Sequence, residues 1–119
     1  MKTSGYPVVV MLMFGLASGA PGKTLKKQES VQTGHASWYH GKGKSDVPTA
    51  AHRTLPFGTY VLVTNLKNNK SIIVKINDRG PFIRGRIIDV NRKAAGELGI
   101  LKSGTARVRI EVVPPPDSP

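Results

Sequence analysis

At positions 76–82 the chain reads INDRGPF, directly after an apolar run that is typical of a β-strand. Asp78 therefore stands where a strand ends and a loop begins, and the Gly80-Pro81 pair behind it predicts a sharp turn. A second motif, TAAHRTLPFGT, occupies positions 49–59 upstream and contributes His52. An imidazole and a carboxylate that can meet in one groove are the best indication of function in the sequence.

Several other segments combine β-branched or aromatic residues with neighbouring Gly, Asn or Pro, which is the pattern of short strands. The polar run 67–70 predicts a hairpin turn between two of them, because its Asn residues adopt positive φ at low cost. The expected strands span 35–39, 60–64, 71–76, 86–90 and 106–113. In the last strand the alternation places four residues on a buried face: Ala106, Val108, Ile110 and Val112.

One short helix is expected over residues 92–98. Asn91 is a suitable N-cap because its side chain can accept from a free backbone N–H, and Gly99 suits the left-handed position just past the helix end. Gly96 inside the helix costs roughly 1 kcal/mol relative to Ala, so packing must hold the helix in place. Many short strands and one helix favour a small β-barrel or sandwich.

The two ends of the chain differ in composition from its centre. Residues 1–20 combine Lys2, an apolar run and small residues near Ala20, which predicts a signal peptide; an uncleaved membrane anchor is the alternative. The apolar run is short for a membrane span, so no stable membrane insertion is expected after cleavage. Residues 21–32 are expected to form a flexible basic linker, 33–113 the folded domain, and 114–119 a Pro-rich tail.

Composition restricts the chemistry of the protein. The chain has no Cys, which excludes disulfides and lipid attachment through Cys. Its net charge of +11 favours polyanionic partners. Nucleic acid is the rival to cell-envelope polymers, but no nucleic-acid recognition motif is present, so none is expected as a partner. The three His residues have no zinc-site spacing and no phosphate-binding loop is present, so neither a metal nor a cofactor is expected.

Seven short motifs occur in an order that resembles the rare lipoprotein A family, the septal endolytic peptidoglycan transglycosylases. The resemblance covers about residues 33–113. The motifs are GHASWY at 34–39, TAAH at 49–52, LPFGT at 55–59, VTNL at 63–66, NDRGPF at 77–82, GRIID at 85–89 and GTARV at 104–108.

The resemblance implies an all-β fold, a small six-stranded double-psi β-barrel with one short helix. It also implies an enzyme, a lytic transglycosylase (a lyase) that cleaves the bond between N-acetylmuramic acid and N-acetylglucosamine and leaves 1,6-anhydro ends. The implied partners are peptidoglycan glycan strands, and the implied role is cell wall organisation at the septum. The protein is then expected to be a monomer, secreted across the inner membrane to the periplasm or cell wall.

Three departures from the family pattern stand out. Family members are often lipoproteins, but this chain has no Cys to lipidate. Many carry a C-terminal peptidoglycan-binding domain, whereas here the barrel region is followed by a Pro-rich stretch. The family usually has a longer loop before the TAAH motif, with a Glu thought to be catalytic. The shorter loop of this chain, residues 40–48, contains no Glu.

Asp78 and His52 are the predicted catalytic residues. A lytic transglycosylase can use one acid/base group, because the attacking nucleophile is the 6-hydroxyl of the sugar itself. Asp78 is the candidate for that group, and as a general acid it needs a pKa raised by burial. Its alternative role is structural, with the carboxylate accepting backbone N–H bonds in the 77–81 turn. His52 would bind substrate or hold a carboxylate in place.

Tyr39, Asp46, Arg79 and Arg84 are the predicted substrate-binding residues. Tyr39 can stack on a sugar ring, and the two Arg residues can meet glycan carboxylates or simply face solvent. Asp46, in the shortened loop, is a possible substitute for the missing Glu. Trp38 is expected to serve mainly as a core residue.

Two functions from different classes follow. The first is the lytic transglycosylase, supported by the intact motifs around His52 and Asp78. The second is a non-catalytic, expansin-like module that binds or loosens peptidoglycan, supported by the missing loop Glu. The position of Asp46 relative to Asp78 distinguishes them at the level of structure.

Overall fold

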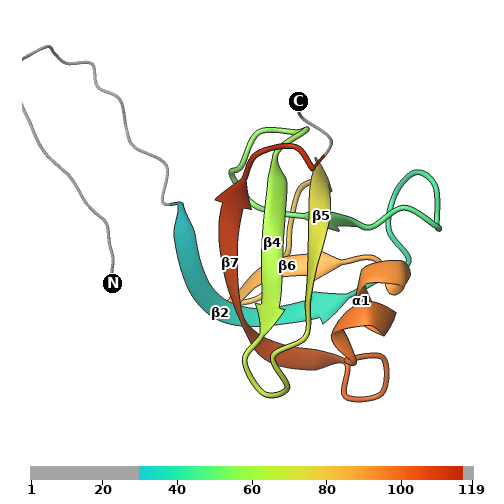
Figure 1. Ribbon diagram of the computed structural model, residues 1–119, viewed down its shortest axis with the longest axis vertical. Coiled ribbons are helices and arrows are strands. Elements are labelled where there is room, and N and C mark those ends of the chain that lie inside the picture. Colours follow the sequence, from blue (N-terminus) through green and yellow to red (C-terminus); the bar gives the residue numbers. More distant parts are fainter. Residues whose placement is uncertain (1–29, 117–119) are drawn as a thin grey trace, which may run out of the picture.

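The hairpin predicted from the Asn-rich turn is present. Strands β4 (Tyr60–Asn65) and β5 (Ser71–Asp78) pair antiparallel, with Val61 opposite Val74 and Val63 opposite Ile72. Asn69 in the turn has a φ of 64°, the left-handed conformation that Asn tolerates. The computed structural model describes residues 30–116, and within them this hairpin forms one wall of a closed barrel (Figure 1).

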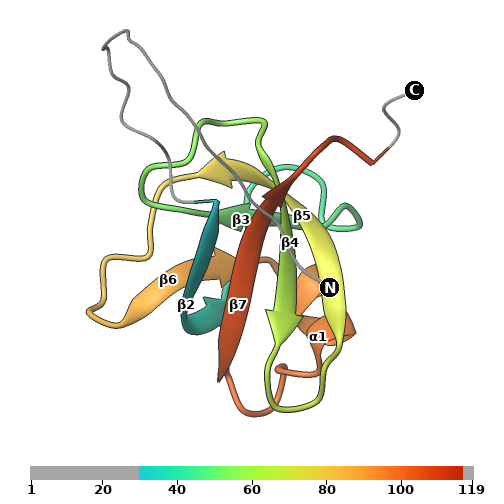
Figure 2. The same cartoon turned by 60° about the vertical axis from the view of Figure 1, so that its left-hand side comes forward.

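Four further strands complete the barrel: β2 (Val31–Trp38), β3 (Thr49–Ala51), β6 (Arg86–Val90) and β7 (Thr105–Val113). Around the barrel the order is β2-β6-β3-β5-β4-β7. The pairs β2–β6 and β3–β5 are parallel, and the other pairs are antiparallel. Figure 2 shows β4 and β7 lying side by side on one wall. The expected six-stranded barrel with one short helix is therefore confirmed.

The helix α1 (Arg92–Leu98) has the expected ends. The Asn91 side chain accepts a hydrogen bond from the backbone N–H of Ala94, and Gly99 has a φ of 76°. Ala94, Ala95 and Leu98 are buried, so one face of the helix packs on the barrel while Gly96 faces solvent. Packing of that face compensates for the low helix propensity of Gly.

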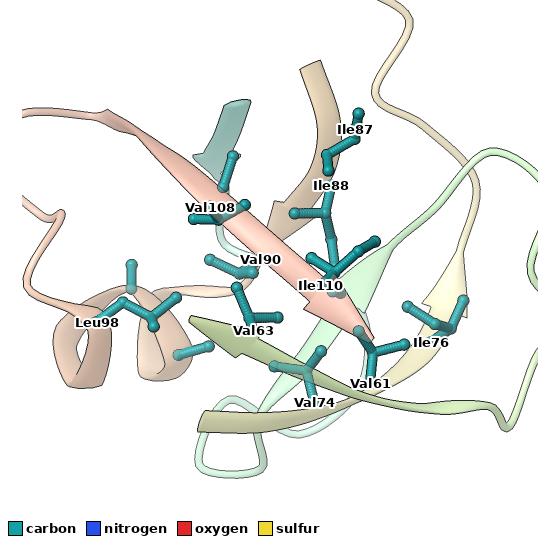
Figure 3. Packing of buried hydrophobic residues seen from close by; sticks show 14 of the residues in the cluster. Val61, Val63, Val74, Ile76, Ile87, Ile88, Val90, Leu98, Val108 and Ile110 are labelled. Carbon is teal, nitrogen blue, oxygen red and sulfur yellow. The ribbon is translucent and has the colours of Figure 1, made fainter. Parts of the chain in front are cut away.

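Apolar side chains from β4, β5, β6 and β7 converge inside the barrel, and Leu98 of α1 joins the same cluster (Figure 3). Burying each Val or Ile stabilises the fold by roughly 1.5–3 kcal/mol. Trp38 packs against this cluster while half-buried, in agreement with its expected role in the core. In β7, Val108 and Ile110 are buried as expected, but Val112 is 40% exposed. Val112 stands opposite the buried Val61, one residue before the end of β7.

The observed strands differ from the expected ones at several boundaries, and one strand was not expected. Strand β2 begins at Val31, inside the expected linker, because its first residues pair with the end of β7. Strand β5 continues to Asp78, two residues beyond its expected end. Strand β3 is absent from the sequence-based prediction, since its three residues have no strand pattern of their own.

Some sequence-based expectations lie outside the described residues. These are the signal peptide at 1–20, most of the linker at 21–32, and residues 117–119 of the Pro-rich tail. Residues 30–116 include no helix whose length and apolar character would let it cross a membrane.

Candidate active site around Asp78

The parallel pair β3–β5 brings the two sequence motifs together. Ala51 pairs with Asp78, so both strands end at the same edge of the barrel. The backbone N–H of His52 donates to the carbonyl of Asp78 at 3.1 Å. A register shift between Ala50 and Ala51 marks an irregularity just before this point. The expected meeting of the two motifs is therefore present in the backbone.

Three donors surround the Asp78 carboxylate. The Tyr39 hydroxyl donates to Oδ2 at 2.8 Å, and the backbone N–H of Arg79 donates to Oδ1 at 2.9 Å. The Lys42 ammonium lies 3.8 Å from Oδ1, and the Asp78 side chain is 26% exposed. Tyr39, one of the predicted substrate-binding residues, thus contacts the predicted acid/base group itself.

These donors determine the charge of Asp78. Burial by itself raises the pKa of Asp78, but the hydrogen bonds from Tyr39 and the Arg79 N–H and the charge of Lys42 outweigh it and lower the pKa below its usual value. The direction is opposite to the one that the sequence argument required of a general acid. Burial and the bond to Asp78 raise the pKa of Tyr39 well above its usual range, so Tyr39 stays a neutral donor. In the free protein Asp78 is a carboxylate.

Within the described residues, the His52 side chain makes no hydrogen bond with the Asp78 carboxylate. Its ring is buried, and Nδ1 accepts from the backbone N–H groups of Thr54 and Leu55, both at 3.1 Å. Since Nδ1 is an acceptor, the proton is assigned to Nε2, which lies 3.1 Å from Oε1 of Gln32 and donates to it. Burial, with the charges of Arg53 and Arg79, lowers the pKa of His52 and keeps the ring neutral. Its contacts are those of a residue that holds the following loop in place.

Arg79 reinforces the same loop. Its Nη1 donates to the carbonyls of His52 and Leu55, at 3.1 and 2.8 Å. Its guanidinium carbon lies 4.2 Å from the centre of the Phe57 ring. Arg79 is thus adjacent to Asp78, as expected, but its guanidinium group contacts the loop that begins at His52.

The shortened loop presents Lys42 to Asp78, and not Asp46. Asp46 is exposed in a turn, and among residues 30–116 it takes part in no ion pair or side-chain hydrogen bond. The carbonyl of Lys42 accepts a hydrogen bond from Asn77 Nδ2 at 3.2 Å, which ties the loop to the end of β5. Sequence reasoning missed Lys42, because nothing in a Gly- and Lys-rich loop indicates which ammonium group faces the barrel.

Arg84 belongs to a different part of the surface. It is exposed and lines a shallow cavity of about 230 Å³ with His35 and Arg86. A larger cavity of about 460 Å³ lies between the shortened loop and α1, and its lining includes His40 and Arg92. Neither lining includes Asp78, whose side chain is partly buried. Within residues 30–116 no three His, Asp or Glu side chains are grouped closely enough to hold a metal ion.

Comparison with known proteins identifies the family of this chain. The sequence profile of the family described as lytic transglycolase matches residues 31–110. The chain belongs to this family. The resemblance to rare lipoprotein A proteins and the expected double-psi β-barrel are confirmed with it.

Family relatives are substantially longer than the region they share with this chain. A protein of Neisseria meningitidis serogroup B named "Endolytic peptidoglycan transglycosylase RlpA" is 52% identical over 101 residues, covering 76% of this chain and 42% of its own length. A Nostoc protein named "Probable endolytic peptidoglycan transglycosylase RlpA" is 63% identical over 65 residues, covering 55% and 18%. The chain therefore spans less than half of the length of these relatives.

Solved structures of distant proteins have the same fold. The apo expansin of Clavibacter michiganensis superposes with a TM-score of 0.59 at 20% identity, covering 75% of this chain and 53% of that one. The Streptomyces papain inhibitor superposes with a TM-score of 0.57 at 23% identity, covering 71% and 94%. At this level of identity the likeness concerns the barrel alone.

Proposed function

We propose that this family member is an exported lytic transglycosylase that cleaves peptidoglycan glycan strands, with Asp78 as its single acid/base group. The observation that carries the proposal is the partly exposed Asp78 carboxylate, held by Tyr39 and the Arg79 N–H where β3 and β5 end. The names of the relatives support the reaction and the substrate. They also support a location in the cell envelope, where peptidoglycan lies.

The proposed reaction starts from the protonated form of Asp78. The acid gives its proton to the glycosidic oxygen, and the bond between that oxygen and C1 of the N-acetylmuramic acid residue breaks. The resulting carboxylate then takes the proton of the sugar's 6-hydroxyl, whose oxygen forms the new bond to C1. The products are a 1,6-anhydro end and a free 4-hydroxyl, and Asp78 is protonated again. No water is consumed, so a second carboxylate to activate water is not needed.

The surrounding residues would act on Asp78 in this cycle. Between the two proton transfers Asp78 is a carboxylate, the form that Tyr39 and Lys42 stabilise. His52 would act indirectly, because its ring holds the loop that adjoins Asp78.

A digest of purified glycan strands by the full chain, read by mass spectrometry, tests the proposal. Anhydro-muramyl products are expected from the wild type, and Asp78→Asn should lower their rate by about 10²–10⁴-fold, the usual contribution of a general acid or base. Asp46→Asn is the matched control, since Asp46 is an exposed loop carboxylate, and it should retain the wild-type rate. Unchanged turnover in Asp78→Asn would exclude Asp78 from this role.

A non-catalytic wall-binding module is the second candidate function. It is favoured by one observation: the donors around Asp78 lower the pKa of its carboxyl, whereas a general acid must be protonated. Absence of anhydro products, together with co-sedimentation of the protein with insoluble peptidoglycan, would support this function over the enzyme.

A further inference from the structure

Two aromatic side chains are exposed beside the candidate active site. Phe57 is 58% exposed and Phe82 is 77% exposed. Both belong to the loops that adjoin Asp78, Phe57 in the loop after β3 and Phe82 in the loop after β5. Single exposed apolar residues are common on protein surfaces. Two exposed aromatic rings in the loops beside a candidate catalytic carboxylate nevertheless require an explanation.

The Phe57 ring is held in a defined position. The guanidinium carbon of Arg79 lies 4.2 Å from the ring centre, within the range of a cation–π contact. Arg79 is itself fixed by its bonds to the carbonyls of His52 and Leu55. One face of the ring therefore rests on a fixed cation, while more than half of the side chain stays exposed.

The backbone keeps Phe57 close to Asp78. Gly58, the next residue, donates its N–H to the carbonyl of Ile76 at 2.8 Å. Ile76 lies two residues before Asp78 on β5, a step of about 7 Å along a strand. Arg79, which covers the ring, also donates its backbone N–H to the Asp78 carboxylate. The ring and the carboxylate thus share one edge of the barrel.

We propose that Phe57 is a stacking platform for a pyranose ring of the glycan strand bound next to Asp78, with Arg79 as the residue that positions it. The inference rests on the proposed function, because it takes the glycan as the ligand. The C–H face of a sugar carries partial positive charge and pairs with the electron-rich face of an aromatic ring. A ring that is already fixed loses little conformational entropy on binding. Phe57 and Phe82 together also offer less area than a stable protein interface, which needs about 800 Å² per partner.

Binding measured in the Asp78→Asn background separates stacking from turnover. The full chain is titrated with purified, soluble glycan strands by isothermal calorimetry. Phe57→Ala should weaken binding by about three- to ten-fold, the size of a lost aromatic contact. Phe57→Leu should weaken it almost as much, and Phe57→Trp should keep it, because the interaction requires an aromatic face. Leu66→Ala is the matched control, since Leu66 is an exposed apolar residue in the β4–β5 turn, and it should have no effect.

The outcomes test the role of Phe57 in glycan binding separately from the proposed enzymatic activity. Binding that is unchanged in Phe57→Ala, or equally weakened in Leu66→Ala, overturns the platform while leaving the reaction at Asp78 intact. Full binding by Phe57→Leu overturns it as well, because bulk would then suffice. Weaker binding by Phe57→Ala, together with a wild-type chain that releases no anhydro products, would establish the platform and contradict the proposed enzyme. A parent protein that binds no glycan strands would overturn both.

Discussion

Asp78 must take up a proton before it can act as an acid, and Lys42 opposes that step. The ammonium group lies 3.8 Å from Oδ1 and favours the ionised carboxylate. Only protonated Asp78 can donate, so kcat/KM should fall as the pH rises through the pKa of Asp78. Because Lys42 lowers this pKa, it moves the fall toward lower pH.

Lys42→Met should therefore move the falling limb of the pH profile to higher pH. Above that limb, turnover should rise by about 1.4- to 5-fold, which corresponds to the ~0.2–1 kcal/mol of an exposed ion pair. The measurement is kcat/KM for glycan strands against pH, together with the pKa of the Asp78 carboxyl from its carbon NMR shift. Lys44→Met removes a charge from the same loop and should leave both unchanged. An unshifted limb in Lys42→Met would show that this ion pair does not govern the protonation of Asp78.

At the scale of single residues, the sequence predicted which residues lie near the site better than it predicted which atoms they contact. Asp78 and Tyr39 were both candidates, and the hydrogen bond between them joins residues 39 positions apart in the chain. His52 was also a candidate, yet its ring contacts Gln32 and two backbone N–H groups. The positions of Lys42 and Phe57 near Asp78 depend on loop conformations. A short loop segment has no sequence pattern from which its conformation can be predicted.

At the scale of the elements, the start of α1 depends on both polar atoms of the Asn91 side chain. Oδ1 accepts from the Ala94 N–H at 3.1 Å, and Nδ2 donates to the Val47 carbonyl at 2.8 Å. The side chain therefore caps the helix and also anchors the shortened loop. Gly41 of that loop passes so close that a Cβ on it would lie 2.6 Å from the Asn91 Cβ.

Asn91→Ala should destabilise the domain by about 2 kcal/mol, because it removes a helix cap and leaves a loop carbonyl without its donor. The free energy of unfolding from urea titration gives the value. Asn91→Ser keeps a neutral acceptor for the helix cap and loses the donor to Val47, so it should cost less. Equal stability of Asn91→Ala and wild type would mean that solvent replaces both contacts.

Local signals explain why some elements were predictable. The helix and the β4–β5 hairpin each have their own caps or turn residues, and both were expected within one or two residues of their observed bounds. β3 has only three residues, and its partners β5 and β6 lie more than twenty positions further along the chain. Its existence depends on pairing that no local pattern encodes.

At the scale of the whole molecule, the barrel topology was predicted from the family resemblance and not from the pattern of apolar and turn residues. Alternation and turns indicated a small barrel or sandwich, and only the family resemblance implied six strands in a double-psi arrangement. Two parallel pairs join strands that are distant in sequence, β2 with β6 and β3 with β5. Periodicity identifies the buried face of a strand, but it contains no information on which strand lies next to it.

The pairing of β2 with β7 has a consequence for how the chain can be connected. Val31 lies opposite Glu111, and the Val112 N–H donates to the Ser30 carbonyl at 2.9 Å. The first and last described strands are thus neighbours, as circular permutation requires. A permutant of residues 30–116, joined by a short Gly-Ser linker and opened at the 67–69 turn, should unfold cooperatively and bind glycan strands like the parent chain. A permutant without cooperative unfolding would show that the hairpin turn is indispensable. If the permutant folds, the barrel can be inserted as a unit into a surface loop of another protein.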